Sequence, residues 1–187
     1  MIQDLTHREI IAFGLGGLVA LAAFNTGVAQ ARMVPSGSME PTFAVGDRLM
    51  VVPAKPKDLG VQRGDVLVFK PPFERTHEAG TTWAQGLMTL ADAQPYIKRA
   101  IGLPGEEIRI RKGVGVFVNG QFLDEPYIRV APQYEFGPTV VPAGHLFMLG
   151  DNRNHSFDSH YWGFLPVKNV TGRPAAVIWP PTRWQRF

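Results

Sequence analysis

Two serine hydroxyls, those of Ser36 and Ser38, flank a glycine within the proline-bounded segment 35–42. The prolines exclude a regular helix there, so the segment is predicted to be a tight loop. Clusters of serine, glycine and proline are most often plain turns. A serine hydroxyl is also a poor nucleophile at its own pKa and needs a neighbouring base. The segment therefore predicts a nucleophile only if another part of the chain supplies that base.

The strongest candidate for the base is Lys98, which follows Tyr96 and Ile97 in a largely apolar segment. Burial disfavours the charged ammonium and therefore lowers the pKa of a lysine. A lysine that is neutral can accept a proton from a serine. The structural alternative is a surface lysine that is paired with an acid.

Histidine is the usual partner of a nucleophilic serine, and the chain has five histidines. Only His155 and His160 lie within or next to a dense cluster of polar side chains, at residues 150–159. Residue types and positions alone therefore leave a lysine base and a histidine base both open.

Four segments, taken together, resemble the signature motifs of type I signal peptidases: 35–42, Arg63–Val66, 96–106 and 150–159. These enzymes are membrane-bound Ser/Lys proteases that cut signal peptides from exported proteins. The motifs stand in the family's order, and the resemblance covers roughly residues 32–180. It implies a membrane-anchored endopeptidase that acts on signal-peptide-bearing preproteins, without a metal or an organic cofactor.

The resemblance also implies a role for each residue of the site. Ser38 would be the nucleophile, and Lys98 the general base that later donates the proton to the leaving amine. The backbone amide of Ser38 and the hydroxyl of Ser36 would hold the oxyanion, because they point at charge that develops only in the transition state. Ser156 would orient the lysine, and Asp158 would be a supporting acid.

The polar cluster also contains His160, Gly150 and Asp151 at or next to its ends. Many relatives have an arginine where this chain has His160, so the resemblance does not imply an ion pair between Asp158 and an arginine. Gly150 and Asp151 belong to the same motif and are expected to set its turn.

The family cuts after a small residue that follows another small residue two positions earlier, the Ala-x-Ala rule. Five apolar residues match its pocket positions: Val34, Met39, Phe43, Tyr96 and Ile97. Bulky walls of this kind leave room for methyl groups only. An extended substrate would add as a strand beside the Ser38 segment and the lysine strand.

Length and composition limit the classes of function that remain possible. The 187 residues are enough for one domain with a small insertion. Cysteine is absent, which excludes disulfides, thiolate metal sites and a cysteine nucleophile. The formal net charge of +3 suits a position beside anionic membrane lipid, whereas no charge block or motif predicts nucleic-acid binding. The 16 prolines and 20 glycines favour a turn-rich β protein.

Residues 10–31 are predominantly apolar, and as a helix they would be about 33 Å long. Because a bilayer core is about 30 Å thick, they are predicted to form one transmembrane anchor. A cleavable signal peptide and a buried core helix are the alternatives. Ala29 and Ala31 imitate a cleavage site at which the protein itself is a potential substrate. The charges on the two flanks do not decide the orientation, and the resemblance places the catalytic domain on the extracytoplasmic side, periplasmic or lumenal.

Apolar runs predict four buried strands, at Arg48–Val52, Asp65–Phe69, Gly144–Gly150 and Arg173–Trp179. Alternating apolar residues on both sides of Asn119–Gly120 predict a β-hairpin, because this dipeptide favours a two-residue turn.

The expected fold class is therefore mostly β, with one transmembrane helix before an antiparallel catalytic domain. The chain is expected to begin with a short amino-terminal segment (1–9) and the anchor (10–31). The catalytic domain follows in two parts (32–105 and 143–187), separated by a small β-rich insertion (106–142). Residues 71–94 are predicted to be a surface loop with a short helix at 82–91.

Two other classes of function stay open. One is a catalytically silent, membrane-anchored β domain that binds preproteins, against which Ser36, Ser38, Lys98 and Ser156 all argue. The other is a self-cleaving Ser/Lys regulator, against which the lack of predicted DNA-binding helices before Ser38 argues.

Overall fold

The computed structural model describes residues 29–55, 58–72 and 95–187. In chain order the elements are β1 (Gln30–Met33), the 3-10 helix η1 (Gly37–Met39), β2 (Arg48–Pro53), β3 (Val66–Phe69), β4 (Tyr96–Gly102), β5 (Glu107–Arg111), β6 (Gly115–Val118), β7 (Gln121–Phe122), β8 (Phe136–Val140), β9 (His145–Leu149), the 3-10 helix η3 (Arg153–His155), α3 (Ser159–Trp162), β10 (Leu165–Pro166), η4 (Val167–Asn169), β11 (Val170–Trp179), η5 (Pro181–Arg183) and β12 (Gln185–Arg186). The prediction of a mostly β chain is confirmed.

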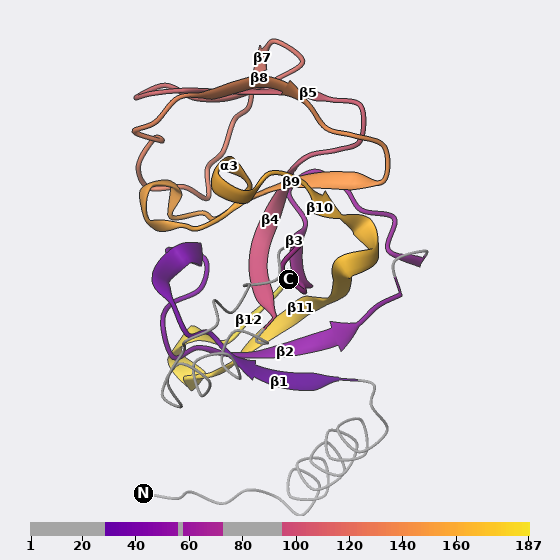
Figure 1. The fold of residues 1–187 in the computed structure, drawn as a ribbon. Helices are drawn as coiled ribbons and strands as arrows, with labels where there is room; N and C mark the ends of the chain where they lie inside the picture. The colour runs from indigo at the N-terminus through magenta and orange to yellow at the C-terminus, as the bar shows by residue number, and fades with distance from the viewer. Residues whose placement is uncertain (1–28, 56–57, 73–94) are drawn as a thin grey trace, which may run out of the picture.

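The strands form two antiparallel sheets. The larger has the order β1-β2-β11-β3-β4-β9-β10, with β12 paired to β11, and the smaller has the order β7-β6-β5-β8. Figure 1 shows the smaller sheet at the top of the molecule and the larger one below it. Strand β4, which carries Lys98, lies between β3 and β9 in the larger sheet.

The buried strands form where the apolar runs predicted them. Strands β2, β3 and β9 confirm three predictions to within a residue or two at each end. Strand β11 begins at Val170, three residues before the predicted start, because its first residues pair with Val68 and Phe69 of β3. Such tertiary pairing extends strands beyond the run that local sequence defines.

The predicted hairpin is confirmed in the smaller sheet. Asn119 and Gly120 have φ values of 50° and 79° and join β6 to β7, as expected for a two-residue hairpin turn with positive φ at both positions. Along β5, residues alternate between exposed and buried, which is the pattern of a strand with one face on a core.

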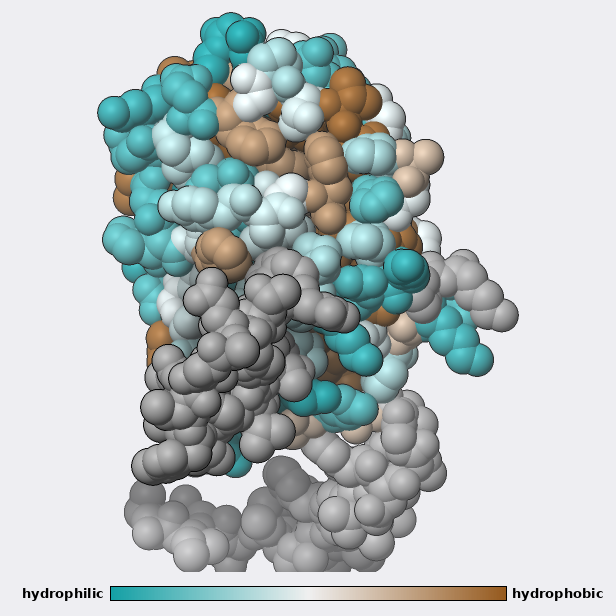
Figure 2. All heavy atoms as spheres, in the orientation of Figure 1, coloured by the Kyte–Doolittle hydropathy of each residue, from teal (hydrophilic) through white to brown (hydrophobic). Residues whose placement is uncertain are grey.

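The two sheets share a hydrophobic core. Ile101 of β4 and Phe147 and Leu149 of β9 pack in one cluster with Ile108 of β5 and Val116 of β6. In Figure 2, hydrophilic residues cover most of the described part of this face, and hydrophobic residues show mainly in the upper half, near the smaller sheet. The smaller sheet is therefore held to β4 and β9 of the larger sheet by apolar packing.

A glycine permits this close approach. A Cβ at Gly102 would lie 2.8 Å from Cδ1 of Ile108 and 2.9 Å from Cβ of Phe147. Both distances are shorter than van der Waals contact, so a side chain at this position would push β4 and β5 apart.

Most of the predicted anchor lies outside the described residues, as do the predicted helix at 82–91 and most of the loop around it. The anchor was predicted to extend to Ala31, but Gln30 and Ala31 belong to β1, where they pair with Val51 and Met50 of β2. In the described ranges no helix combines the length and the apolar character needed to span a bilayer. All strands of the smaller sheet fall within residues 106–142, and the division into domains stays a prediction.

Candidate active site

Ser38 is held at the surface of the core by the residues that follow it. Its backbone lies in η1, and the next residue, Met39, is fully buried together with Phe43 in a cluster that includes Leu49 and Val177. The backbone N–H of Phe43 donates to the carbonyl of Met39, which closes the turn. These contacts fix the serine in place, and the residue is 8% exposed.

Lys98 and Ser38 are in direct contact. The Nζ atom of Lys98 lies 2.6 Å from Oγ of Ser38, across 60 residues of sequence. Lys98 is 4% exposed, and its strand partner on β3 is Leu67. The ammonium therefore has little access to water and has a hydroxyl as its hydrogen-bond partner.

Burial lowers the pKa of Lys98 to about 8. The negative charges of Asp158 and Asp151 act in the opposite direction and raise this pKa, but desolvation is the larger effect. A base is most effective when its pKa is close to the working pH. Lys98 is therefore suited to accept a proton from Ser38 in mildly alkaline solution.

Ser36 contributes a second hydroxyl to the site. Its Oγ lies 3.4 Å from Oγ of Ser38, and the residue is exposed. Ser36 has extended backbone geometry, with φ −143° and ψ 158°, immediately before η1. An exposed hydroxyl therefore lies beside the hydroxyl of Ser38.

Ser156 is buried against the serine loop. Its Oγ has no hydrogen-bond partner among the described residues. A Cβ at Gly150 would overlap both this hydroxyl and the backbone carbonyl of Ser38. The absence of a side chain at Gly150 thus lets the Ser156 side chain and the Ser38 backbone pack against it. The Ser156 hydroxyl can still form a hydrogen bond there.

Asp158 is a structural support whose partner is His160. Its Oδ2 accepts from the backbone N–H of Gly150 at 2.9 Å, and its Oδ1 lies 2.7 Å from Nδ1 of His160. The ring of His160 stacks on Tyr134, with centroids 4.0 Å apart. Asp158 also caps the amino terminus of α3. The carboxylate therefore fixes the turn beside Ser156, and its side-chain partner is a histidine.

Neither histidine of the polar cluster is placed as a base. His160 is engaged with Asp158, and His155 is exposed, with Nδ1 3.3 Å from Oδ1 of Asn152. No hydrogen bond within the described ranges joins either ring to Ser38.

Asn152 holds the backbone of the serine loop, a role that the sequence patterns did not indicate. Its backbone N–H donates to the carbonyl of Ser38 at 3.1 Å, and its Nδ2 donates to the carbonyl of Gly37 at 3.0 Å. In the sequence, only the position of Asn152 within the polar cluster pointed to a role at the site.

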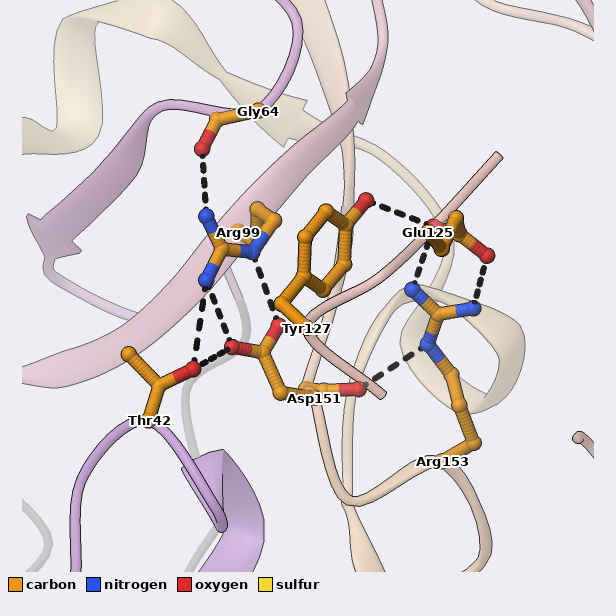
Figure 3. A network of polar contacts seen from close by, with 8 residues as sticks. Thr42, Gly64, Arg99, Glu125, Tyr127, Asp151 and Arg153 are labelled. Carbon is orange, nitrogen blue, oxygen red and sulfur yellow. Dashed lines mark hydrogen bonds and ion pairs between the residues drawn. The ribbon is translucent and has the colours of Figure 1, made fainter. Parts of the chain in front are cut away.

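A buried ion pair joins the lysine strand to the polar cluster (Figure 3). Nε and NH2 of Arg99 lie 2.8 and 2.6 Å from the two carboxylate oxygens of Asp151, and NH1 donates to the carbonyl of Gly64. Thr42 donates to the same carboxylate. Asp151 was expected only to set a turn, but it ties together β4 and the loop after Ser38.

A second ion pair in Figure 3 reaches the segment that follows β7. NH1 and NH2 of Arg153 lie 2.5 and 2.6 Å from the carboxylate of Glu125, and both side chains are almost fully buried. Nε of Arg153 donates to the carbonyl of Gly150 at 3.1 Å. The hydroxyl of Tyr127 also donates to Glu125, and its ring lies 3.9 Å from the guanidinium of Arg99. No sequence pattern predicted this network, because Glu125 lies in a polar segment without a motif.

Two of the five predicted pocket residues line a small apolar pocket before Ser38, with a cavity volume of about 30 Å³. Its walls include Val34, Pro35, Leu49, Val51, Val68 and Ile97. Met39 and Phe43 lie in the core cluster behind it and are fully buried. Tyr96 packs instead against Phe69, with ring centroids 6.2 Å apart. The structure therefore brings Val34 and Ile97 to the pocket and leaves the other three outside its lining.

No group of three or more potential metal-ligating side chains occurs in the described part of the chain. The prediction that no metal or organic cofactor takes part stays a prediction.

Comparison with known proteins gives one consistent family. The sequence matches the family described as "Signal peptidase, peptidase S26" over residues 7–179. It is 43% identical over 166 residues to a probable signal peptidase I-2 of Synechocystis sp., covering 89% of this chain and 70% of that protein. It is 42% identical over 174 residues to a signal peptidase I of Leptolyngbya laminosa, covering 93% and 80%. A crystal structure of a signal peptidase I from Enterococcus faecalis V583 is 30% identical, with a TM-score of 0.44 and coverage of 60% of this chain and 95% of that chain.

Proposed function

The chain belongs to the signal peptidases of peptidase family S26, serine endopeptidases that remove signal peptides, and from this premise we propose that Ser38 and Lys98 are its catalytic dyad. The observation that carries the proposal is the 2.6 Å contact between Nζ of the buried Lys98 and Oγ of Ser38. A pKa of about 8 for Lys98 gives the base a neutral fraction near neutral pH.

The reaction follows from this contact. Lys98 Nζ accepts the proton of Ser38 as Oγ attacks the scissile carbonyl carbon. The resulting oxyanion is held by the hydroxyl of Ser36 and the backbone N–H of Ser38. The Lys98 ammonium then gives its proton to the leaving amine, which departs as the amino terminus of the mature protein. A water molecule, deprotonated by Lys98, hydrolyses the acyl-enzyme ester and releases the signal peptide.

Ser156 and Asp158 act on the dyad indirectly in this proposal. The buried, unpartnered hydroxyl of Ser156 is available to accept from the Lys98 ammonium once Ser38 is acylated. Asp158 fixes the Gly150 turn on which Ser156 packs. Its charge also raises the pKa of Lys98, which keeps the lysine able to take up a proton.

The small apolar pocket favours small side chains in the substrate. The pocket between Val34, Val68 and Ile97 is small, with a volume of about 30 Å³, and its apolar walls favour a small apolar side chain. This supports cleavage after an Ala-x-Ala-like sequence. We place residues 10–31 in the membrane as a single anchor, apart from Gln30 and Ala31, with the catalytic part on the extracytoplasmic side.

The test is cleavage of a preprotein with an Ala-x-Ala site by the full chain in detergent. Ser38→Ala is expected to abolish cleavage and to leave thermal unfolding unchanged, because the loss of one hydroxyl in a loop costs little stability. Thr182→Ala, which removes an exposed hydroxyl far along the chain, is the matched control and should cleave normally. Cleavage by Ser38→Ala would refute the dyad, and the absence of cleavage by the unaltered protein would favour a silent binding domain.

Ser36→Ala is expected to lower kcat by about 10²- to 10³-fold with little change in KM, as for the loss of one oxyanion donor. Steady-state kinetics on the same preprotein measures both constants. A rise in KM at unchanged kcat would instead make Ser36 a ground-state binding residue.

A further inference from the structure

A second groove, with a volume of about 260 Å³, opens beside Ser38 and has a different character from the apolar pocket. Its lining includes Glu40, Arg129, Asn152, Asn154 and His155. The apolar pocket is lined by the residues that come just before Ser38, and this groove by a residue that comes just after it. The two recesses therefore involve residues on either side of Ser38 along the chain.

The groove is in contact with the nucleophile's own backbone. Asn152 donates from its backbone to the carbonyl of Ser38 and from its side chain to the carbonyl of Gly37. The Glu40 side chain folds back toward Gly37, since a Cβ there would lie 3.2 Å from Cδ of Glu40. A residue that lines the groove is therefore in direct contact with the serine loop.

Two charged side chains of the groove have no ion-pair partner among the residues that the structure describes. Asp151 is paired with Arg99, and Arg153 with Glu125. By contrast, the side chains of Glu40 and Arg129 make no hydrogen bond or ion pair with any residue that the structure describes, and they do not pair with each other. Glu40 is partly exposed and Arg129 is exposed. Both charges are thus available to a ligand.

A substrate that is cut at Ser38 must continue on both sides of the scissile bond. Its signal-peptide side requires small apolar recesses, which the first pocket offers. Its other side is the start of a protein that will live in water, and its first residues are commonly polar. At about 3.3 Å per residue, an extended segment of three or four residues would span about 10 to 13 Å beyond the cut.

We infer that the groove binds the first residues of the mature part of the preprotein, and that Glu40 and Arg129 select their charge. This inference rests on the proposed function. Glu40, two residues from Ser38, favours a basic over an acidic side chain at the mature positions nearest the cut. Arg129, on the segment that follows β7, favours an acidic side chain at the positions farther from it.

The effect should be moderate. Pairs of partly exposed charges contribute little each, so reversing one from attraction to repulsion should change a substrate preference by about 2- to 10-fold. The preference should also weaken at 1 M salt, where charges are screened within about 3 Å.

The experiment uses the full chain in detergent and preproteins with one fixed Ala-x-Ala site. A single lysine or aspartate is placed at each of the first five mature positions, and the ratio of kcat/KM for the lysine and aspartate substrates is measured position by position. Glu40→Lys is expected to lower this ratio at the nearest positions, and Arg129→Glu to raise it at the farther ones. Glu40→Gln should give about half of the Glu40→Lys effect on a logarithmic scale. It replaces Glu40→Lys in the experiment if that variant folds poorly.

The controls are Glu107→Lys and Arg109→Glu, which make the same charge changes at exposed positions of β5. They should leave the ratio unchanged at every position. Ratios that are unaltered in both groove variants, or altered equally in the controls, would overturn the inference while cleavage itself continued. Failure of the unaltered protein to cleave any of the preproteins would instead count against the proposed function.

Discussion

Lys98→Arg is expected to abolish cleavage even though the side chain keeps its positive charge. A guanidinium stays protonated at every workable pH and cannot accept the Ser38 proton. The loss in kcat should be about 10⁴-fold or more, because the nucleophile then has no base. Lys168→Arg makes the same exchange at an exposed position and should cleave normally.

The pH dependence of the unaltered enzyme tests the same base. With a pKa of about 8 for Lys98, kcat/KM should rise about tenfold per pH unit well below that value and reach a plateau above about pH 9. The value of kcat/KM rises with pH because Lys98 acts as a base only when it is deprotonated. Bound substrate expels water and should move the profile of kcat to lower pH than that of kcat/KM.

A histidine base would give different results. His155→Ala should retain most activity in the Ser38–Lys98 mechanism, since His155 is exposed and contacts Asn152 rather than Ser38. Substantial cleavage by Lys98→Arg, or complete loss of cleavage in His155→Ala, would show that a histidine rather than Lys98 is the base.

Glu125→Gln is expected to destabilise the fold by about 3 to 5 kcal/mol. The substitution keeps the shape of the side chain but leaves the buried guanidinium of Arg153 without a counter-charge. Urea unfolding, followed by tryptophan fluorescence, measures the change. Glu107→Gln removes an exposed carboxylate from β5 and is the matched control.

The double variant Glu125→Leu with Arg153→Met separates the charge from the packing. Replacing both members of a buried ion pair by apolar groups is often neutral, so the double variant should be more stable than Glu125→Gln. An unfolding midpoint in Glu125→Gln equal to that of the unaltered protein would show that the pair does not hold the segment after β7 to the loop that follows β9.

The sequence by itself determined the residue types of the site and the strands that carry them. The valine-rich runs around Val51 and Val68 predict buried strands, because such side chains suit a half-buried pleated surface. The Asn119–Gly120 turn depends only on local backbone preferences, and its positive φ values follow from them. Ser38 and Lys98 stood out because a hydroxyl in a proline-bounded loop and a lysine in an apolar strand are each unusual.

Only the tertiary structure decided which side chains meet. Ser38 and Lys98 are 60 residues apart, and Arg153 and Glu125 are 28 apart. Periodicity reports which face of a strand is buried, but not which strand pairs with it or in which register, because that depends on non-local packing of the whole sheet. The same reason explains why Met39 and Phe43 lie behind the pocket while Leu49 and Val51, to which no motif pointed, form its walls.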